Sequence, residues 1–303
     1  MEETPTALLE IEGLTAERPQ GMGERGIGLR DVSFTVHSGE ILVLAGEAGS
    51  GRSLLGLLLV GLSGPGVKVL DGEIRFDGID LLKARAKERR RLRRSEIAII
   101  RRGAHDQFNP DRTVRKWLRE VVKMARRTRE LDDEKKWSDY FYRVGIVEPE
   151  QILPRRMHEL PSITIQRLML LRALIGKAKL VICDDATADL DRIAEKQFIE
   201  LLSQLRTEEN IAVLMTMGSL RGVGQFADRV AVLYEGGLLE IGPAHEIVES
   251  PAFAYTREFL VSLPRITHLP RLLPTVSKNA AREAEGVIHR QASPIDPSAA
   301  AKD

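Results

Sequence analysis

The chain has 303 residues, of which 43% are hydrophobic and 29% are charged, and its formal net charge is +1. This composition is ordinary for a globular protein of one large or two small domains. The small net charge excludes a protein drawn as a whole to nucleic acid or membranes. The single cysteine, Cys183, excludes a disulfide framework and favours a reducing compartment. The N-terminus lacks a signal-peptide pattern, and the longest apolar run, residues 54–62, is too short to span a bilayer, so we expect a cytoplasmic protein.

The first hundred residues alternate between strand and helix patterns. A continuous apolar run at 41–46 is typical of a buried parallel strand, and it leads through a glycine-rich loop into a leucine-rich helix. The other elements predicted here are strands at 8–12 and 30–36 around a glycine-rich turn at 21–28, a strand at 73–76 with a turn at 77–78, a basic helix at 82–94 and a strand at 97–100.

The alternation continues, and it predicts a parallel sheet covered by helices on both faces. The predicted elements are helices at 114–143, 162–174 and 192–206, strands at 180–185, 211–216 and 229–234, and a turn at 236–237. From about residue 264 the composition changes to Pro, Ala, Ser and scattered charges, so we expect 264–303 to be a tail without a fold of its own. The basic run within 85–94 is interpreted as a solvated helix face, and no nucleic-acid motif accompanies it.

The loop after the buried strand has the composition and context of a phosphate-binding loop. Small residues let backbone N–H groups turn toward phosphate oxygens, and the following helix N-terminus adds positive potential. A glycine-rich turn without a ligand is the alternative. The residues expected to hold a nucleotide here are Gly46, Gly49, Ser50, Gly51, Arg52 and Ser53, with the Ser53 hydroxyl placed for magnesium.

Further motifs follow in order, and with them residues 8 to about 263 resemble the ATP-binding-cassette (ABC) ATPases. The segment Pro251 with Tyr255-Thr256-Arg257 is similar to that of the dipeptide/oligopeptide importer class. The other segments that carry the resemblance are Gly72-Glu73-Ile74 with Phe76-Asp77-Gly78, Phe108-Asn109-Pro110 with Thr113-Val114, His158-Glu159-Leu160 with Gln166-Arg167, 180–191 ending in Leu190-Asp191, Asp228-Arg229-Val230, and Glu240 with Gly242.

The resemblance implies an α/β fold: a P-loop NTPase core with a parallel sheet, an antiparallel β subdomain and an inserted helical subdomain at about 104–172, together forming one nucleotide-binding domain over residues 1–263. It also implies ATP as cofactor. In the family, each nucleotide lies between the phosphate loop of one subunit and the signature segment of another. The implied partners are therefore a paralogous ABC ATPase subunit, in a heterodimer, and transmembrane permease subunits.

The chain departs from the family at the positions that carry chemistry. The phosphate-loop lysine is Arg52, whose planar fork is not equivalent to an ammonium. The glutamine-loop position falls at Arg102, beside Arg101, and a guanidinium repels a metal. The position of the adenine-stacking aromatic falls at Arg18. The Walker B aspartate is kept as Asp184, so the magnesium that the family holds with Ser53 and Asp184 is in question.

Two more departures concern proton transfer and the partner's nucleotide. The catalytic glutamate is Asp185, one methylene shorter, and a general base must reach its water. The switch histidine falls at Gly218, or at Met217 if the loop holds one insertion. In the signature segment a proline removes one N–H and an isoleucine fills space that the family leaves to glycine. That segment comprises Leu160, Pro161, Ser162, Ile163 and Thr164.

These departures predict a subunit of a peptide-type transporter that is impaired in ATP hydrolysis and paired with an active paralogue, peripheral on the inner face of the cell membrane. Two alternatives stay open. One is a soluble nucleotide-sensing or scaffold protein without a permease, and the other is a slow but active ATPase. The C-terminal extensions of peptide-importer ATPases resemble an iron–sulfur site. Residues 264–303 contain no cysteine, so such a site is excluded here.

Overall fold

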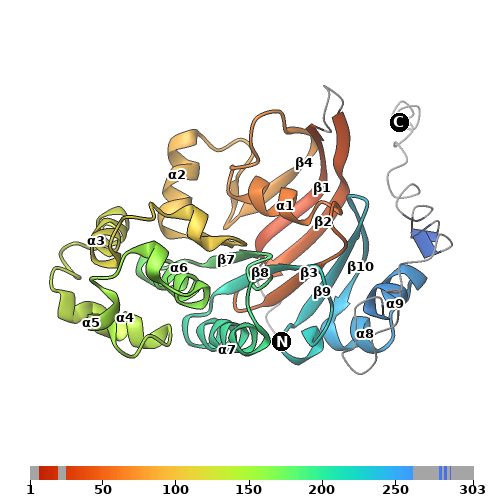
Figure 1. Cartoon of the computed structure of the whole chain (residues 1–303). Coiled ribbons are helices and arrows are strands. Elements are labelled where there is room, and N and C mark those ends of the chain that lie inside the picture. The colour runs from red at the N-terminus through yellow and green to blue at the C-terminus, as the bar shows by residue number, and fades with distance from the viewer. Residues whose placement is uncertain (1–6, 20–24, 262–279, 282, 285–286, 288–303) are drawn as a thin grey trace, which may run out of the picture.

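The computed structural model describes residues 7–19, 25–261, 280–281, 283–284 and 287. The strands in this part of the chain are β1 (Ala7–Pro19), β2 (Arg25–His37), β3 (Ile41–Ala45), β4 (Lys68–Phe76), β5 (Ile79–Asp80), β6 (Ile97–Arg101), β7 (Leu180–Asp184), β8 (Ala212–Met217), β9 (Arg229–Tyr234) and β10 (Gly237–Pro243). They form one sheet in the order β5-β4-β1-β2-β10-β9-β3-β8-β7-β6 (Figure 1).

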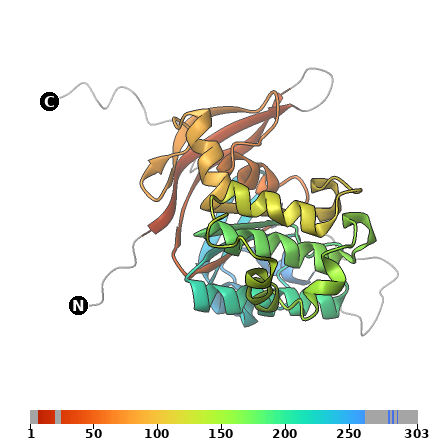
Figure 2. The ribbon, with the colours of Figure 1, turned by 90° about the vertical axis from the view of Figure 1, so that its left-hand side faces the viewer.

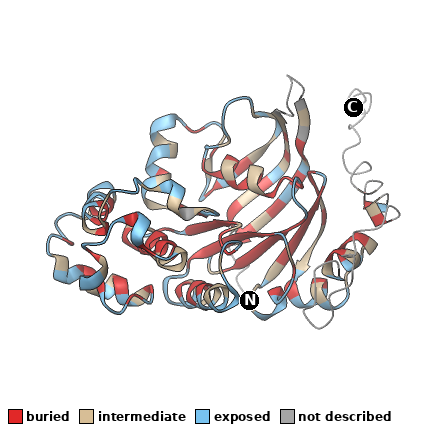
Figure 3. Ribbon diagram, in the orientation of Figure 1, coloured by how far each residue is buried: buried red, intermediate tan, exposed pale blue. Residues whose placement is uncertain are grey.

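Strand β3 lies at the centre of the parallel part and is buried on both faces. It pairs in parallel with β8 and β9, and β7 pairs in parallel with β8 and β6. Successive side chains of a strand point to opposite faces. Ile41, Val43 and Ala45 accordingly join one apolar cluster, whereas Leu42 and Leu44 join another. The predicted buried parallel strand is thereby confirmed, and Figure 3 shows buried residues along these strands.

An antiparallel unit formed by β1, β2, β4 and β5 extends the sheet at one side. Its strands are longer than predicted: β2 begins at Arg25, inside the predicted turn at 21–28, because residues 25–27 pair with Glu17, Arg18 and Pro19 of β1. Residues 20–24 lie outside the described residues. This unit meets the parallel part through one pair, Gly237 with Arg30, between β10 and β2.

Helices cover both faces of the sheet and gather in one subdomain beside it (Figures 1 and 2). The helices within and around this helical subdomain are α3 (Val114–Met124), α4 (Ser138–Arg143), α5 (Pro149–Ile152) and α6 (Ser162–Gly176). The others are α1 (Arg52–Leu59), α2 (Ala86–Ser95), α7 (Arg192–Glu209), α8 (Ala244–Glu249) and α9 (Ala254–Val261). The basic helix α2 begins four residues later than predicted, because Asp80 Oδ1 accepts from the N–H groups of Leu82 and Lys83 and forms a turn there.

The single helix predicted at 114–143 is wrong. Helix α3 ends at Met124, Arg126 adopts a left-handed backbone with φ of 58°, and α4 begins only at Ser138. The Trp137 indole N–H donates to the Leu131 carbonyl at 3.1 Å, and both side chains are buried. The apolar residues of this segment therefore reach the core through a fold-back of the chain rather than along one continuous helix.

Most of the predicted tail at 264–303 lies outside the described residues. Residues 280–281, 283–284 and 287 are described and helical, and Ala284 is buried in the same apolar cluster as β3. No helix in the described ranges is long and apolar enough to cross a membrane.

Candidate nucleotide-binding site

The predicted phosphate loop connects β3 to α1, as expected. Glycine is required at two of its positions for lack of space. Gly46 has φ of 158°, and a Cβ on it would lie 2.4 Å from the Leu233 carbonyl oxygen. Gly51 has φ of 101°, and its Cβ would lie 2.5 Å from the Gly28 carbonyl oxygen. These contacts fix the loop tightly against β9 and β2, at the edge of the sheet where ligands of open α/β folds bind.

Arg52 and Asp185 form an ion pair across this edge. Arg52 Nη1 donates to Asp185 Oδ1 at 2.9 Å, and the arginine side chain is only 7% exposed. Gly218 lies beside them, since a Cβ there would be 3.7 Å from Arg52 Nη2. The structure therefore brings three predicted site residues together, and Gly218 rather than the buried Met217 faces the pair. Asp185 has a left-handed backbone with φ of 46°, which is uncommon for a residue other than glycine.

Asp184, the last residue of β7, is held by Thr216 and Arg101. Its Oδ1 accepts from the Thr216 hydroxyl at 3.2 Å, and the same hydroxyl accepts from the Asp185 N–H at 2.9 Å. Its Oδ2 lies 3.6 Å from Arg101 Nε. Thr216 thus orients both carboxylate-bearing residues. Thr216 lies in β8, and the pairing of β8 with β7 cannot be predicted from patterns in the sequence alone.

Arg102 points away from these carboxylates, which differs from the expectation that its guanidinium repels a metal at this site. Its Nε donates to Asp189 Oδ1 at 2.9 Å, and its side chain is 66% exposed. Its backbone N–H bonds to the Asp184 carbonyl oxygen, which sends its side chain and that of Arg101 in different directions. Arg101 is consequently the arginine of this pair that lies near Asp184.

The signature segment starts α6. Leu160 is buried, Pro161 is the exposed N-cap, and the helix begins at Ser162. Ile163 and Thr164 are half-buried in its first turn. No hydrogen bond or ion pair in the described chain joins residues 160–164 to the phosphate loop. Behind the segment, the buried Gln166 side chain donates to the Ala186 carbonyl oxygen and so links α6 to the residues after Asp185.

A cavity of about 460 Å³ adjoins the outer side of the phosphate loop. Arg18 reaches this loop: its Nη2 is 3.8 Å from the place of a Cβ on Gly49. Tyr234 and Tyr255 lie against each other with ring centroids 4.5 Å apart, and burial raises the pKa of Tyr255. A planar guanidinium stacks on flat rings, so Arg18 has the shape to face a base. The cavity is lined by Arg18, Arg30, Glu47, Ala48, Gly49, Ser50, Tyr234, Glu235 and Tyr255.

The donor set for magnesium is sparse. The Ser53 hydroxyl makes no hydrogen bond within the described residues, and Asp184 offers one carboxylate. Mg²⁺ prefers octahedral oxygen coordination with one or two carboxylates and phosphate oxygens. The Arg101 guanidinium, whose Nε lies 3.6 Å from Asp184 Oδ2, competes with such an ion for this carboxylate. No group of three or more His, Cys, Asp or Glu residues forms a metal site in the described ranges. These residues fit the ion poorly.

Comparisons with known proteins identify the family. The family described as "ABC transporter" matches residues 29–188. The chain is 32% identical over 278 residues to the dipeptide transport ATP-binding protein DppD of Escherichia coli, covering 88% of this chain and 84% of that protein. It is 33% identical over 267 residues to the peptidoglycan transport ATP-binding protein YejF of Agrobacterium fabrum, of which it spans about half, 49%.

Solved structures give the same fold. The ABC transporter cassette MJ0796 superposes with a TM-score of 0.65 at 21% identity, over 78% of this chain and 98% of that one. The protein cbiO1 of Clostridium perfringens, part of an ABC transporter complex, superposes with a TM-score of 0.66 at 25% identity, over 86% of this chain and 97% of that one. The predicted fold class is confirmed, and the chain belongs to the ATP-binding proteins of the ABC transporter family.

Proposed function

We propose that this chain is the ATP-binding subunit of a peptide-type import system, that it hydrolyses ATP at or near background, and that it works beside an active paralogue beneath a permease on the inner face of the membrane. Relatives at about this identity are named as dipeptide transport and peptide import ATP-binding proteins. Those names support the class of cargo. The lack of hydrolysis rests on this chain's own residues.

The observation that carries the proposal is the ion pair between Arg52 and Asp185. A phosphate-loop cation must be free to meet phosphate, and a general base must be free to accept a proton from water. In this structure each of the two groups satisfies the other at 2.9 Å. Gly218 supplies no side chain that could hold a γ-phosphate, and Arg102 is engaged with Asp189. Of the four positions at which the family performs chemistry, three side chains are thus engaged in ion pairs and the fourth position, Gly218, has no side chain.

Nucleotide binding is compatible with this arrangement. The backbone cradle of 46–51 is intact, and the cavity beside Arg18 lies next to it. A phosphate that enters must compete with Asp185 for Arg52, and guanidinium pairs strongly with phosphate. We therefore propose that ATP binds without hydrolysis and with little dependence on magnesium.

A steady-state phosphate-release assay on the purified chain tests the loss of hydrolysis. We expect background rates, and turnover approaching ~1 s⁻¹, the low end of ordinary enzymes, would contradict the proposal in favour of a slow but active ATPase. Copurification from membranes with permease subunits tests the placement. A chain found only in the soluble fraction would favour the nucleotide-sensing or scaffold alternative.

Restoring the signature segment tests the pairing. The variant Pro161→Ser/Ser162→Gly/Ile163→Gly returns small residues to the start of α6, where Pro161 is exposed and unbonded to the phosphate loop. We expect it to raise ATPase activity in a reconstituted heterodimer with the paralogue and to leave the isolated chain unchanged. No gain in a heterodimer whose assembly has been verified would count against the paralogue.

A further inference from the structure

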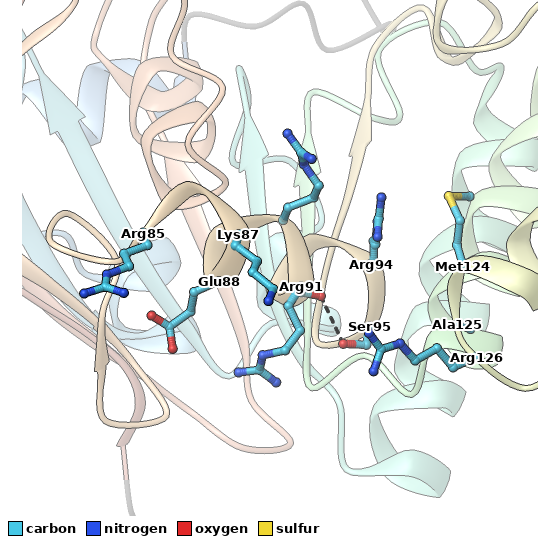
Figure 4. Close-up of a pocket in the computed structure, with 10 residues that line it drawn as sticks. Arg85, Lys87, Glu88, Arg91, Arg94, Ser95, Met124, Ala125 and Arg126 are labelled. Atoms are coloured by element: carbon cyan, nitrogen blue, oxygen red, sulfur yellow. Dashed lines mark hydrogen bonds between the residues drawn. The ribbon is translucent and has the colours of Figure 1, made fainter.

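A second cavity, of about 690 Å³, lies between α2 and the end of α3 and is strongly cationic. Figure 4 shows Arg126 extending from the end of α3 toward α2, beside Ser95. The volume of the cavity is within the range of small-molecule sites. Glu88 is the only acidic residue of its lining, which consists of Arg85, Lys87, Glu88, Arg90, Arg91, Arg94, Ser95, Met124, Ala125 and Arg126.

The basic residues of α2 divide into two faces with different roles. Arg89 and Arg93, one turn apart, point inward: Arg93 Nη1 donates to the Val60 carbonyl at 2.7 Å, and Arg89 Nη1 lies 3.4 Å from the Leu81 and Leu82 carbonyls. Lys87, Arg90 and Arg94 recur at the spacing of another helix face, and that face lines the cavity. Arg89 and Arg93 anchor α2 to the core, so the cations that face the cavity are not needed as anchors.

Within the described part of the chain, five of the six cations that line the cavity have no carboxylate partner. Arg91 pairs with Glu96. Among the described residues, no acidic oxygen lies within 4.0 Å of the other five cations, namely Arg85, Lys87, Arg90, Arg94 and Arg126. Another polar cavity gives a contrast, because there Lys179 pairs with Asp77 and Arg143 pairs with Glu209.

The charge of one cavity-facing cation, Arg90, acts on the inward-facing Arg93. Burial, followed by the positive charges of Arg89 and Arg90, lowers the pKa of Arg93. The helix dipole favours cations at a C-terminus only, which accounts for Arg94. It disfavours Lys87 in the first turn. A solvated face explains scattered exposed charges, but it does not explain why α2 and the turn after α3 both direct cations into one concave site.

We propose that this cavity binds a group carrying two or more phosphates. Guanidinium forks match phosphate oxygens bidentately, and a multiply charged anion relieves the repulsion of several cations at once. Met124, 41% exposed, gives the rim an apolar side chain. The phosphates can come from a soluble polyphosphate or from the headgroup of an anionic phospholipid. The site is separate from the phosphate loop and does not depend on the function proposed above.

Calorimetric titration of the full chain with inorganic tripolyphosphate tests the site. Sedimentation with vesicles of phosphatidylcholine, with or without cardiolipin, whose headgroup carries two phosphates, distinguishes the lipid source. The variant Arg90→Gln/Arg94→Gln/Arg126→Gln removes three cavity cations and keeps a good helix former at the two positions within α2. Its matched control, Arg155→Gln/Arg192→Gln/Arg221→Gln, removes three exposed arginines on other elements. Thermal unfolding of both variants checks that each is folded.

We expect the cavity variant to bind tripolyphosphate at least about tenfold more weakly than wild type, and the control to bind as wild type. Because we propose that the phosphate loop also binds phosphates, hydrogen exchange in wild type is used to locate the site: residues 85–95 should gain protection. Loss of vesicle binding in the cavity variant alone assigns a lipid headgroup, and loss of tripolyphosphate binding alone assigns a soluble anion. Unchanged binding in the cavity variant, or an equal loss in the control, would overturn the proposal.

Discussion

Arg102 and Asp189 tie the segment after β6 to the segment after β7: Arg102 Nε donates to Asp189 Oδ1 at 2.9 Å. The Gly103 backbone N–H donates to the other oxygen of the same carboxylate at 3.2 Å. One carboxylate therefore holds both a charged side chain and the backbone of the loop that begins there. The two bonds are separable by mutation, because only the first requires Arg102.

Asp189→Ala should loosen this loop, whereas Arg102→Gln should leave it in place. The ion pair is largely exposed, and such pairs contribute about 0–1 kcal/mol, so neither variant should lower the free energy of unfolding by more than ~1 kcal/mol. Hydrogen exchange of the Gly103 N–H provides the measurement. It should accelerate in Asp189→Ala only. Equal acceleration in Arg102→Gln would mean that the side-chain pair, and not the backbone bond, fixes the loop.

Gly51→Ala should destabilise the chain more than Gly78→Ala. Both glycines have left-handed φ values, 101° and 75°, so both variants suffer backbone strain of about 1–2 kcal/mol. Only at Gly51 does the new Cβ meet other atoms, the Gly28 carbonyl oxygen at 2.5 Å and Leu29 Cδ2 at 2.8 Å. We therefore expect Gly51→Ala to lower the free energy of unfolding by a further ~1–3 kcal/mol. Urea unfolding of both variants measures the difference. Equal losses would show that strain alone makes glycine necessary in the loop.

Cys183 should make the protein less stable in alkali. Burial, and then the charge of Asp184, raises the pKa of its thiol from 9.0 to about 12. Below pH 9 both folded and unfolded states keep the proton. As pH rises from 9 toward 12, the unfolded state loses the proton while the folded state retains it, so stability falls by up to ~1.4 kcal/mol per pH unit. Urea unfolding at pH 8 and pH 10.5 should show a smaller loss in Cys183→Ala, and an identical loss in both proteins would contradict this assignment.

Asp185→Asn should strengthen ATP binding, because it frees Arg52 from its 2.9 Å ion pair. A gain of about tenfold is expected from one released charge-assisted hydrogen bond, measured by calorimetry in chelator and again in magnesium. The matched control is Asp189→Asn, the same change four residues later at a carboxylate that holds Arg102 instead. Two results would contradict a site in which Arg52 controls the affinity for ATP. One is that the wild-type protein binds ATP only in magnesium, and the other is that Asp189→Asn gains as much affinity as Asp185→Asn.

Much of the fold was accessible from periodicity, and its limits have physical causes. The apolar run of β3 predicts burial on both faces, and both faces are indeed covered. The break after α3 was missed because Arg126 is not a residue that usually adopts a left-handed backbone. The length of β2 was missed because pairing with β1, rather than local composition, decides the conformation of residues 25–28.

The candidate site was predicted in part. Arg52, Asp185 and Gly218 were placed by resemblance and converge in the structure. The direction of Arg102 was not accessible, because it depends on a carboxylate 87 residues away. Thr216 was missed as well: its contribution follows from the pairing of β7 with β8, which brings it opposite Asp184.

The position of β3 at the centre of the sheet has a consequence for biosynthesis. Its two neighbours lie far along the chain, since Ile41 pairs with Val213 and Leu42 with Arg229. As the ribosome releases the chain from the N-terminus, β1 and β2 can pair early, but β3 must wait for β8 and β9 with both of its edges unpaired. Sheets of such distant contacts form slowly, and unpaired apolar strands aggregate. A nascent chain that stalls before residue 212 would therefore be a substrate for chaperones.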